Sequence, residues 1–318
     1  MPGPEVHDGA LTPELGTAVR LLADRAREHD GIEALGEQTL LHLAAPGADV
    51  RHVLAPPGTG EPSPDGPGTA EPRTPGSGLL GYASVDLSAV ATGSATIELV
   101  VAPEARRRGL GRSLLATARE LATQRGAPRP SVWAHGDLPG ARALAARSGL
   151  VPTRELWQMT LDLSSTSGTE TPEVPGGVTV RPFVPGLDEE AWLDVNSRAF
   201  ADHPEQGRMT LEDLRARQRE PWFDPRDLLL AERAGTVLAS TWMKVEPGSD
   251  SGELYALGVD PQAQGSGLGR LLTALTVDHL RRLGLREAML YTEASNTAAV
   301  RTYTRAGFRR SRVDVQYS

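Results

Sequence analysis

The chain has 318 residues, a formal net charge of −8 and no cysteine. This length is enough for two domains, each with its own core. The acidic balance gives no support to nucleic-acid binding, and the lack of cysteine excludes disulfides, a thiol nucleophile and thiolate metal sites.

The first residues, MPGPEVHDGALTPEL, lack the basic flank and apolar core of a signal peptide, and no run approaches about 18 apolar residues. We therefore expect a cytoplasmic protein without a membrane partner. The sequence does not fix the oligomeric state, and a monomer is compatible with it. No second histidine lies at ligand spacing from His203, so no metal site is expected.

The first half begins with a stretch that we interpret as helical, residues 30–43, followed by strand-like segments at 50–55 and 78–87. Between these strands, residues 55–78 are dominated by Pro, Gly, Ser and Thr, which is typical of a disordered surface excursion. Later elements are a strand at 95–101, a helix from Gly109, a strand at 130–134, a helix from Leu138 and a strand at 156–163.

Residues 164–177 have the composition of a linker, and the second half follows them. Its expected elements are, in chain order, strand 177–183, helices 188–200 and 211–219, strands 227–233, 236–245 and 253–259, helix 267–283, strand 287–292, helix 296–307 and strand 309–318.

Glycines recur at a constant interval along the chain. Gly109 and Gly111 reappear 158 residues later as Gly267 and Gly269, and Gly149 reappears at the same interval as Gly307. A repeat of this length indicates a duplicated domain. We therefore predict two tandem α/β (α+β) domains, residues 1–163 and 178–318, joined by the linker 164–177.

The glycines follow a strand and open a helix, where free N–H groups and the helix dipole favour an anion. Without a Cβ, they let a phosphate reach the backbone. Arg270 occupies the third-glycine place of a dinucleotide fingerprint, and no G-x-x-x-x-G-K-S/T motif exists. The sequence therefore predicts a pyrophosphate site of another kind, with a structural glycine turn as the alternative.

Gln264-x-x-Gly267-x-Gly269, followed by Asn296, Ala299, Tyr303, Gly307 and Phe308, resembles the GCN5-related N-acetyltransferases (GNAT family). The resemblance implies a mixed sheet flanked by helices, and a bulged strand that pairs with the pantetheine of acetyl-CoA, the co-substrate. It implies cofactor contacts from Leu257, Val259, Gln264, Gly265, Ser266, Gly267, Leu268, Gly269, Arg270 and Asn296, and in the first copy from Val101, Arg106, Gly109 and Gly111.

Further stretches resemble a tandem-domain group within that family: FADHPEQGR (200–208), WFDP (222–225), TWMK (241–244), GELYALGVDP (252–261) and VDVQYS (313–318). The resemblance implies a small-molecule acceptor, the cysteinyl amine of a cysteine joined to glucosaminyl-inositol (Cys-GlcN-Ins). Such a polyol needs polar partners, and the candidates are Asp30, Glu37, His203, Glu205, Arg208, Trp242 and Lys244.

Acetyl transfer from a thioester to an amine needs a base, donors for the developing oxyanion and a proton for the thiolate. Glu253 opens the strand before the glycine loop and is the expected base; otherwise it is an ordinary strand residue. Leu257 and Val259 would act through their N–H groups. The family implies that Tyr303 is the acid; otherwise it is a packed aromatic.

The first copy lacks these groups. At the same interval Ala95, Leu138 and Ala145 replace Glu253, Asn296 and Tyr303. We therefore predict that the first copy binds acetyl-CoA without transferring acetyl and forms one wall of the substrate site. Two other functions stay open: acetylation of another small amine or a protein N-terminus, and a non-catalytic acetyl-CoA sensor.

Overall fold

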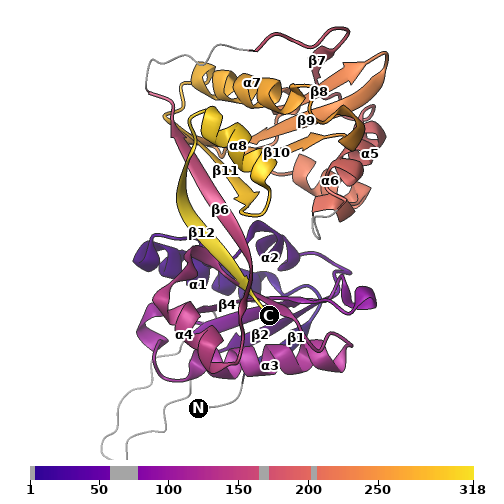
Figure 1. The fold of residues 1–318 in the computed structure, drawn as a ribbon. Helices are drawn as coiled ribbons and strands as arrows, with labels where there is room; N and C mark the ends of the chain where they lie inside the picture. Colours follow the sequence, from indigo (N-terminus) through magenta and orange to yellow (C-terminus); the bar gives the residue numbers. More distant parts are fainter. Residues whose placement is uncertain (1–3, 58–77, 165–171, 202–205) are drawn as a thin grey trace, which may run out of the picture. The chain divides into compact units, whose positions relative to one another are not determined.

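A computed structural model describes residues 4–57, 78–164, 172–201 and 206–318. Residues 58–77 of the expected excursion and 165–171 of the expected linker lie outside them. The chain divides by its contacts into two units (Figure 1): unit 1 is Met1–Glu155 with Val313–Ser318, and unit 2 is Leu156–Arg312.

Unit 1 contains a sheet with the strand order β1-β2-β3-β4-β5-β12, in which only β4 and β5 run parallel. Its strands are β1 (Glu5–Asp8), β2 (Val50–Ala55), β3 (Gly81–Asp86), β4 (Thr96–Val101), β5 (Ser131–Ala134) and the end of β12 (Arg309–Tyr317). Its helices are α1 (Pro13–Asp30), α2 (Glu37–His42), α3 (Leu110–Gln124) and α4 (Pro139–Arg147).

Unit 2 repeats this topology with the order β6-β11-β10-β9-β8-β7, and its parallel pair is β10 and β11. Its strands are β6 (Pro152–Asp162), β7 (Thr179–Pro182), β8 (Leu228–Arg233), β9 (Thr236–Lys244), β10 (Ser251–Val259) and β11 (Glu287–Glu293). Its helices are α5 (Glu189–Ala199), α6 (Leu211–Gln218), α7 (Leu268–Arg282) and α8 (Thr297–Arg305).

The sixth strand of each sheet comes from the other half of the sequence. Residues 156–162 of β6, which follow α4, pair with β11 in unit 2. Residues 315–317 of β12, which follow α8, pair with β5 in unit 1. The division by contacts therefore runs through these two strands, whereas the sequence suggested boundaries at 163 and 178.

The α/β class with a mixed sheet in each copy is confirmed, but the helix expected over 30–43 is wrong. Helix α1 instead spans Pro13–Asp30, with Thr12 as N-cap and Gly31 as left-handed C-cap at φ 70°. Of the expected stretch, only Asp30, the last residue of α1, and Glu37–His42 are α-helical. The N-cap, the proline at N1 and the C-cap glycine are all start and stop signals visible in the sequence.

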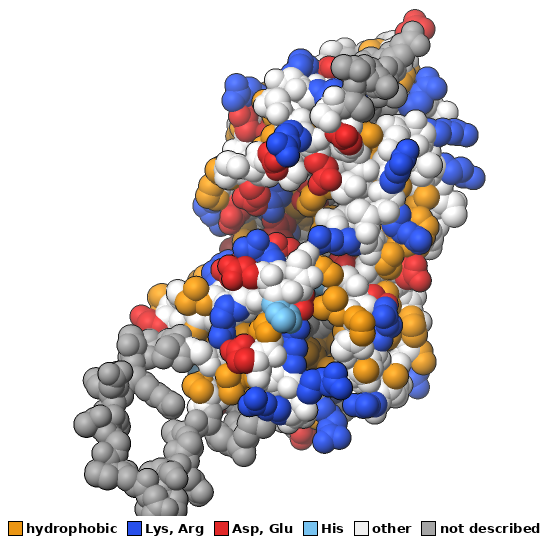
Figure 2. Space-filling view, turned by 90° about the vertical axis from the view of Figure 1, so that its left-hand side faces the viewer, with side chains coloured by type: hydrophobic (Ala, Val, Ile, Leu, Met, Phe, Trp, Pro, Cys, Tyr) orange, Lys and Arg blue, Asp and Glu red, His pale blue; other side chains and the backbone are white. Residues whose placement is uncertain are grey.

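Each sheet is buried on both faces. In unit 2, Leu254, Val277 and Tyr303 pack together on the side of α7 and α8. Trp192, Leu214 and Trp242 form a second core on the side of α5 and α6. The face in Figure 2 shows acidic and basic side chains interspersed. Within the described ranges, no helix is long and apolar enough to cross a bilayer.

Candidate active site

The two glycine loops have the same backbone conformation. Gly265 and Gly267 have φ of 79° and 90°, and their counterparts Arg107 and Gly109 have φ of 64° and 85°. No side chain caps the first turn of α7 or of α3. Residues 264–267 are exposed. Both loops therefore offer uncapped N–H groups at a helix N-terminus, where a diphosphate fits.

The parallel strands of each unit part next to these loops. β10 pairs with β11 only from Ser251 to Leu254, although both strands continue. β4 pairs with β5 only at Thr96 and Ile97. An extended chain can therefore lie between the strands beyond the last pairs, which fits the pantetheine arm of coenzyme A.

Backbone donors of β10 point into this parting. The Asp260 N–H donates to the Leu238 carbonyl of β9, at 2.8 Å. Since alternate residues of a strand point to opposite edges, the N–H groups of Leu257 and Val259 point away from β9. Their N–H groups are therefore directed into the parting, and their contact with a ligand stays a prediction.

A bulge in β10 determines where Glu253 points. Tyr255 has no partner on β9, because the register shifts between Leu254 and Ala256. Leu254 packs on the side of α7 and α8. Glu253, its neighbour, therefore points to the α5–α6 face, where it is half-buried and directly opposite Lys244 of β9.

The first copy has no such bulge, so its true counterpart of Glu253 is shifted by one residue. Glu253 pairs with Met289, and Thr96 pairs with Ser131, 158 residues earlier than Met289. Thr96 rather than Ala95 therefore occupies the position of Glu253. Like Ala95, Thr96 has no carboxylate that could act as the base.

Tyr303 lies on α8, on the opposite face of the unit 2 sheet from Glu253. It is 6% exposed, and its ring packs edge-on against Phe308, at 6.1 Å between centroids. Burial raises the pKa of its hydroxyl. No hydrogen bond of this hydroxyl occurs within the described ranges. The phenol therefore keeps its proton at neutral pH and has one to donate.

Asn296 caps α8, and its side chain accepts a hydrogen bond from the Ala299 N–H at 3.1 Å. Asn296 thus begins the helix that the sequence predicted over 296–307. Ser266 also makes a local bond, donating from Oγ to the Ala263 carbonyl. Gln264 and Arg270 are exposed at the loop and the first turn of α7.

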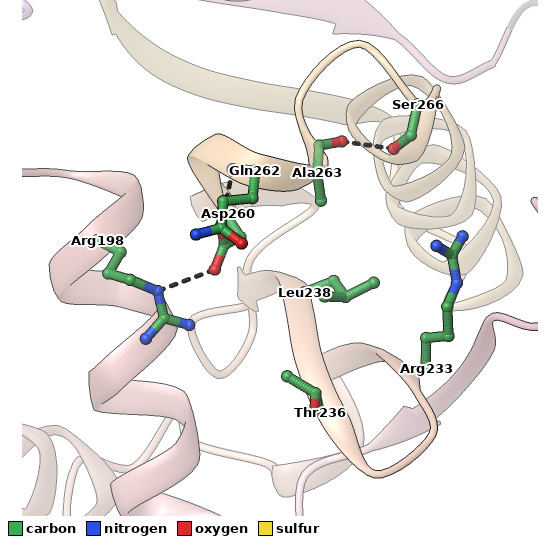
Figure 3. A pocket seen from close by; sticks show the side chains of 8 residues that line it. All are labelled: Arg198, Arg233, Thr236, Leu238, Asp260, Gln262, Ala263 and Ser266. Atoms are coloured by element: carbon green, nitrogen blue, oxygen red, sulfur yellow. Dashed lines mark hydrogen bonds and ion pairs between the residues drawn. The ribbon is translucent and has the colours of Figure 1, made fainter.

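A pocket of about 500 Å³ lies beside the glycine loop of unit 2 (Figure 3). Arg198 of α5 donates from Nε to Asp260 at 2.8 Å on one side, and Arg233 of β8 stands on the other. Neither Glu253 nor Tyr303 lines this pocket. The pocket therefore lies at the loop and apart from these two side chains.

The loop of unit 1 is also held by an ion pair, between Arg106 of the loop and the end of α1. Asp30, at the end of α1, accepts two hydrogen bonds from Arg106 at 2.8 and 2.7 Å. Arg106 also donates to the Val101 carbonyl. Both carboxylate oxygens of Asp30 thus support the loop, a role that the sequence analysis did not foresee for a candidate acceptor residue.

The other acceptor candidates have different surroundings. Trp242 is fully buried among Trp192, Trp222 and Tyr255, so its side chain packs in the core. Lys244 is half-buried, and its ammonium lies 3.1 Å from Glu246. Glu37 opens α2, and Arg208 is exposed. His203 and Glu205 lie outside the described residues.

Sequence reasoning missed a buried charge cluster in unit 1. Glu98 lies on β4, 3.5 Å from the His135 ring, which is 3.0 Å from Asp314 of β12. The Gly36 N–H donates to Glu98, and the Gly136 N–H donates to Asp314. Burial alone would lower the pKa of His135, but its hydrogen bonds and the charges of both carboxylates raise it to about 10.

The comparisons with known proteins agree with this geometry. The family model "Acetyltransferase (GNAT) family" matches residues 74–150 and 190–308. The chain belongs to this family, and it is an N-acetyltransferase. Among solved structures, a tandem GNAT protein from the clavulanic acid biosynthesis pathway has a TM-score of 0.68 at 20% identity, covering 99% of this chain and 97% of its own.

Full-length relatives narrow the family further. The chain is 53% identical to a mycothiol acetyltransferase of Cellulomonas flavigena, over 97% of this chain and 87% of the relative. It is 47% identical to a mycothiol acetyltransferase of Sanguibacter keddieii, over 98% of this chain and 95% of the relative. Within the GNAT family, the chain therefore belongs to the mycothiol acetyltransferases.

Proposed function

We propose that this chain transfers the acetyl group of acetyl-CoA to the cysteinyl amine of desacetylmycothiol (Cys-GlcN-Ins), giving mycothiol and CoA. The names of the relatives support the choice of desacetylmycothiol as the acceptor. The observation that carries the reaction is the parting of β10 from β11, which lies beside an open phosphate loop and between a carboxylate and a buried phenol.

The loop of residues 264–270 holds the diphosphate of the donor through backbone N–H groups, and the N–H groups of Leu257 and Val259 hold its arm. When bound, acetyl-CoA supplies the activated acetyl group. A thioester carbonyl near the Leu257 N–H would gain a hydrogen bond as its oxygen becomes negative, which lowers the barrier to attack.

Glu253 removes the proton of the acceptor ammonium, directly or through a water, from the α5–α6 face. Tyr303 donates its proton to the departing thiolate from the α7–α8 face, and the second proton that the nitrogen loses as the amide forms restores the Tyr303 hydroxyl. The parting opens the sheet between these faces, so an acceptor and a donor can approach from opposite sides. Glu37, Arg208 and Lys244 remain proposed acceptor contacts, together with His203 and Glu205.

Thiol release from acetyl-CoA, with and without Cys-GlcN-Ins, tests the proposal. Glu253→Gln should lower kcat by about 10²-fold or more while the affinity for CoA stays within about twofold, since only the base is lost. Tyr303→Phe should lower kcat similarly and leave the unfolding free energy nearly unchanged, since the ring remains.

Glu190→Gln, an exposed carboxylate on α5, is the matched control and should retain full activity. Release with another amine but not with Cys-GlcN-Ins would replace the acceptor. Full turnover in Glu253→Gln would remove this residue from the mechanism.

A further inference from the structure

The residue at the β10 bulge is held in place from three sides. The Tyr255 hydroxyl accepts a hydrogen bond from Arg217 Nε of α6 at 2.7 Å. Its ring lies 5.4 Å from that of Trp222, and the Lys244 ammonium lies 5.9 Å from its centroid. We call Arg217, Trp222, Lys244 and Tyr255 the Tyr255 clamp.

The clamp is largely shielded from solvent. Arg217 is 8% exposed, and the Lys244 side chain is 15% exposed. The Lys244 ammonium also lies 5.1 Å above the Trp222 ring. Cation–π contacts of this kind strengthen as water is excluded, so the ammonium has a defined position rather than the mobility of a surface lysine.

The bulge decides which face of the sheet receives Glu253. Without the extra residue, strict alternation back from Leu257 would turn residue 253 toward α7 and α8. With Tyr255 inserted, Glu253 shares the α5–α6 face with Tyr255. Side chains directly opposite on antiparallel strands have Cβ atoms about 5 Å apart, so Lys244 is the nearest cross-strand neighbour of Glu253.

We propose that Tyr255 is a positioning residue for Glu253: clamped by Arg217 and Lys244, it fixes the bulge that turns the Glu253 carboxylate to the acceptor face beside the Lys244 ammonium. This inference rests on the proposed role of Glu253 as base. It gives Lys244 an electrostatic task that is separate from any contact with the acceptor.

The charged and titratable groups on this face can be assigned strand by strand. β9 contributes Lys244, whose ammonium lies 3.1 Å from Glu246 just beyond the strand. β10 contributes Tyr255, and α6 contributes Arg217. On β11, Ala288 and Leu290 pack toward α7 and α8, so the opposite set faces the same side as Glu253: Glu287, Met289, Tyr291 and Glu293. Carboxylates on β11 favour a protonated Glu253, and the cation of Lys244 opposes them.

The test is the pH dependence of kcat with acetyl-CoA and Cys-GlcN-Ins at saturation, using the full chain. Lys244→Met should move the acidic limb to higher pH by about one unit, because the carboxylate loses its cation. Lys244→Arg should leave the limb in place. Tyr255→Phe keeps the ring but loses the Arg217 hydrogen bond, and should lower kcat about tenfold with KM for acetyl-CoA within about twofold.

An NMR titration of Glu253, which does not depend on turnover, tests the same proposal. The carboxyl resonance of Glu253 in a chain labelled with ¹³C-glutamate is identified by its absence in Glu253→Gln. Its titration midpoint should rise in Lys244→Met and stay in Lys244→Arg. An unmoved midpoint and limb in Lys244→Met, or full kcat in Tyr255→Phe, overturns the clamp alone; full turnover in Glu253→Gln overturns the proposed base.

Discussion

Arg107 shows at the scale of one residue how the first copy has kept its loop. It has a left-handed φ of 64°, the conformation that Gly265 adopts at φ 79° in unit 2. A non-glycine residue pays about 1 kcal/mol or more for this conformation. The loop of unit 1 therefore has the shape of the unit 2 loop without the glycine best suited to it, which supports the prediction that unit 1 binds a diphosphate.

Arg107→Gly should raise the unfolding free energy of unit 1 by about 0.5 kcal/mol, because the relief of strain exceeds the entropy of the added glycine. The neighbour Arg108 has no positive φ, so Arg108→Gly should lower the same quantity by about 0.5–1 kcal/mol. Urea unfolding of both variants, followed by hydrogen exchange of unit 1 peptides, checks the opposite signs. Equal effects would show that the loop relaxes without strain.

The residues of the site differ in how far the sequence could reveal them. The loop could be predicted from Gly265, Gly267 and Gly269, because backbone conformation depends on local residue type. The family resemblance implied a bulged strand, but the position of the bulge at Tyr255 could not be predicted, since alternation alone does not reveal an unpaired residue. Glu98 and Asp314 lie far apart in the sequence, so only the paired sheet brings their charges together.

At the scale of elements, β12 is what brings Asp314 into unit 1. Its residues 315–317 pair with β5, and Tyr317 donates its hydroxyl hydrogen bond to Asp137 at 2.6 Å. Asp314 contacts both His135 and Gly136 at the end of β5. The strand therefore closes one edge of the unit 1 sheet and also completes its buried charge cluster.

Because of the His135 cluster, we expect unit 1 to lose stability at alkaline pH. The folded pKa of about 10 lies above the ordinary value of 6.5, so the contribution is complete below about 6.5 and is lost as pH rises through about 10. Asp314→Asn removes one partner of a buried ion pair and should lower the unfolding free energy of unit 1 by about 3 kcal/mol at pH 7.

Hydrogen exchange of peptides from β2 to β5, compared at pH 7 and pH 10, measures this effect. Asp278→Asn, which breaks an exposed pair with Arg282, is the control and should change stability by less than about 0.5 kcal/mol. Equal protection in Asp314→Asn and the original chain at pH 7 would contradict the role of the cluster.

At the scale of the whole molecule, the chain is a duplication in which both copies keep a glycine loop and a strand parting, but Thr96 and Ala145 stand in the first copy where the second has Glu253 and Tyr303. The repeat could be predicted from glycine spacing. The pairing of β6 in unit 2 and of β12 in unit 1 could not be predicted, because the residues of a strand do not show which of two similar sheets it joins.

Substituting the matched glycines, Gly111 and Gly269, tests CoA binding by each copy separately. A Cβ at Gly111 would come no nearer than 3.5 Å to another side chain, and one at Gly269 no nearer than 3.9 Å, so neither position lacks room for a Cβ. Calorimetry should find two CoA sites per chain, and one in each variant. Gly111→Val should keep turnover and Gly269→Val should lose it. Two sites in Gly111→Val would exclude the unit 1 loop.

The strand exchange also sets an order of events during synthesis. Residues 313–318 leave the ribosome after all of unit 2, so the open edge of β5 waits for its partner while the second half is being translated. Exposed edges of this kind recruit other strands. Unit 1, which is translated first, is therefore completed last. A chain that is truncated before residue 313 lacks the last strand of the unit 1 sheet.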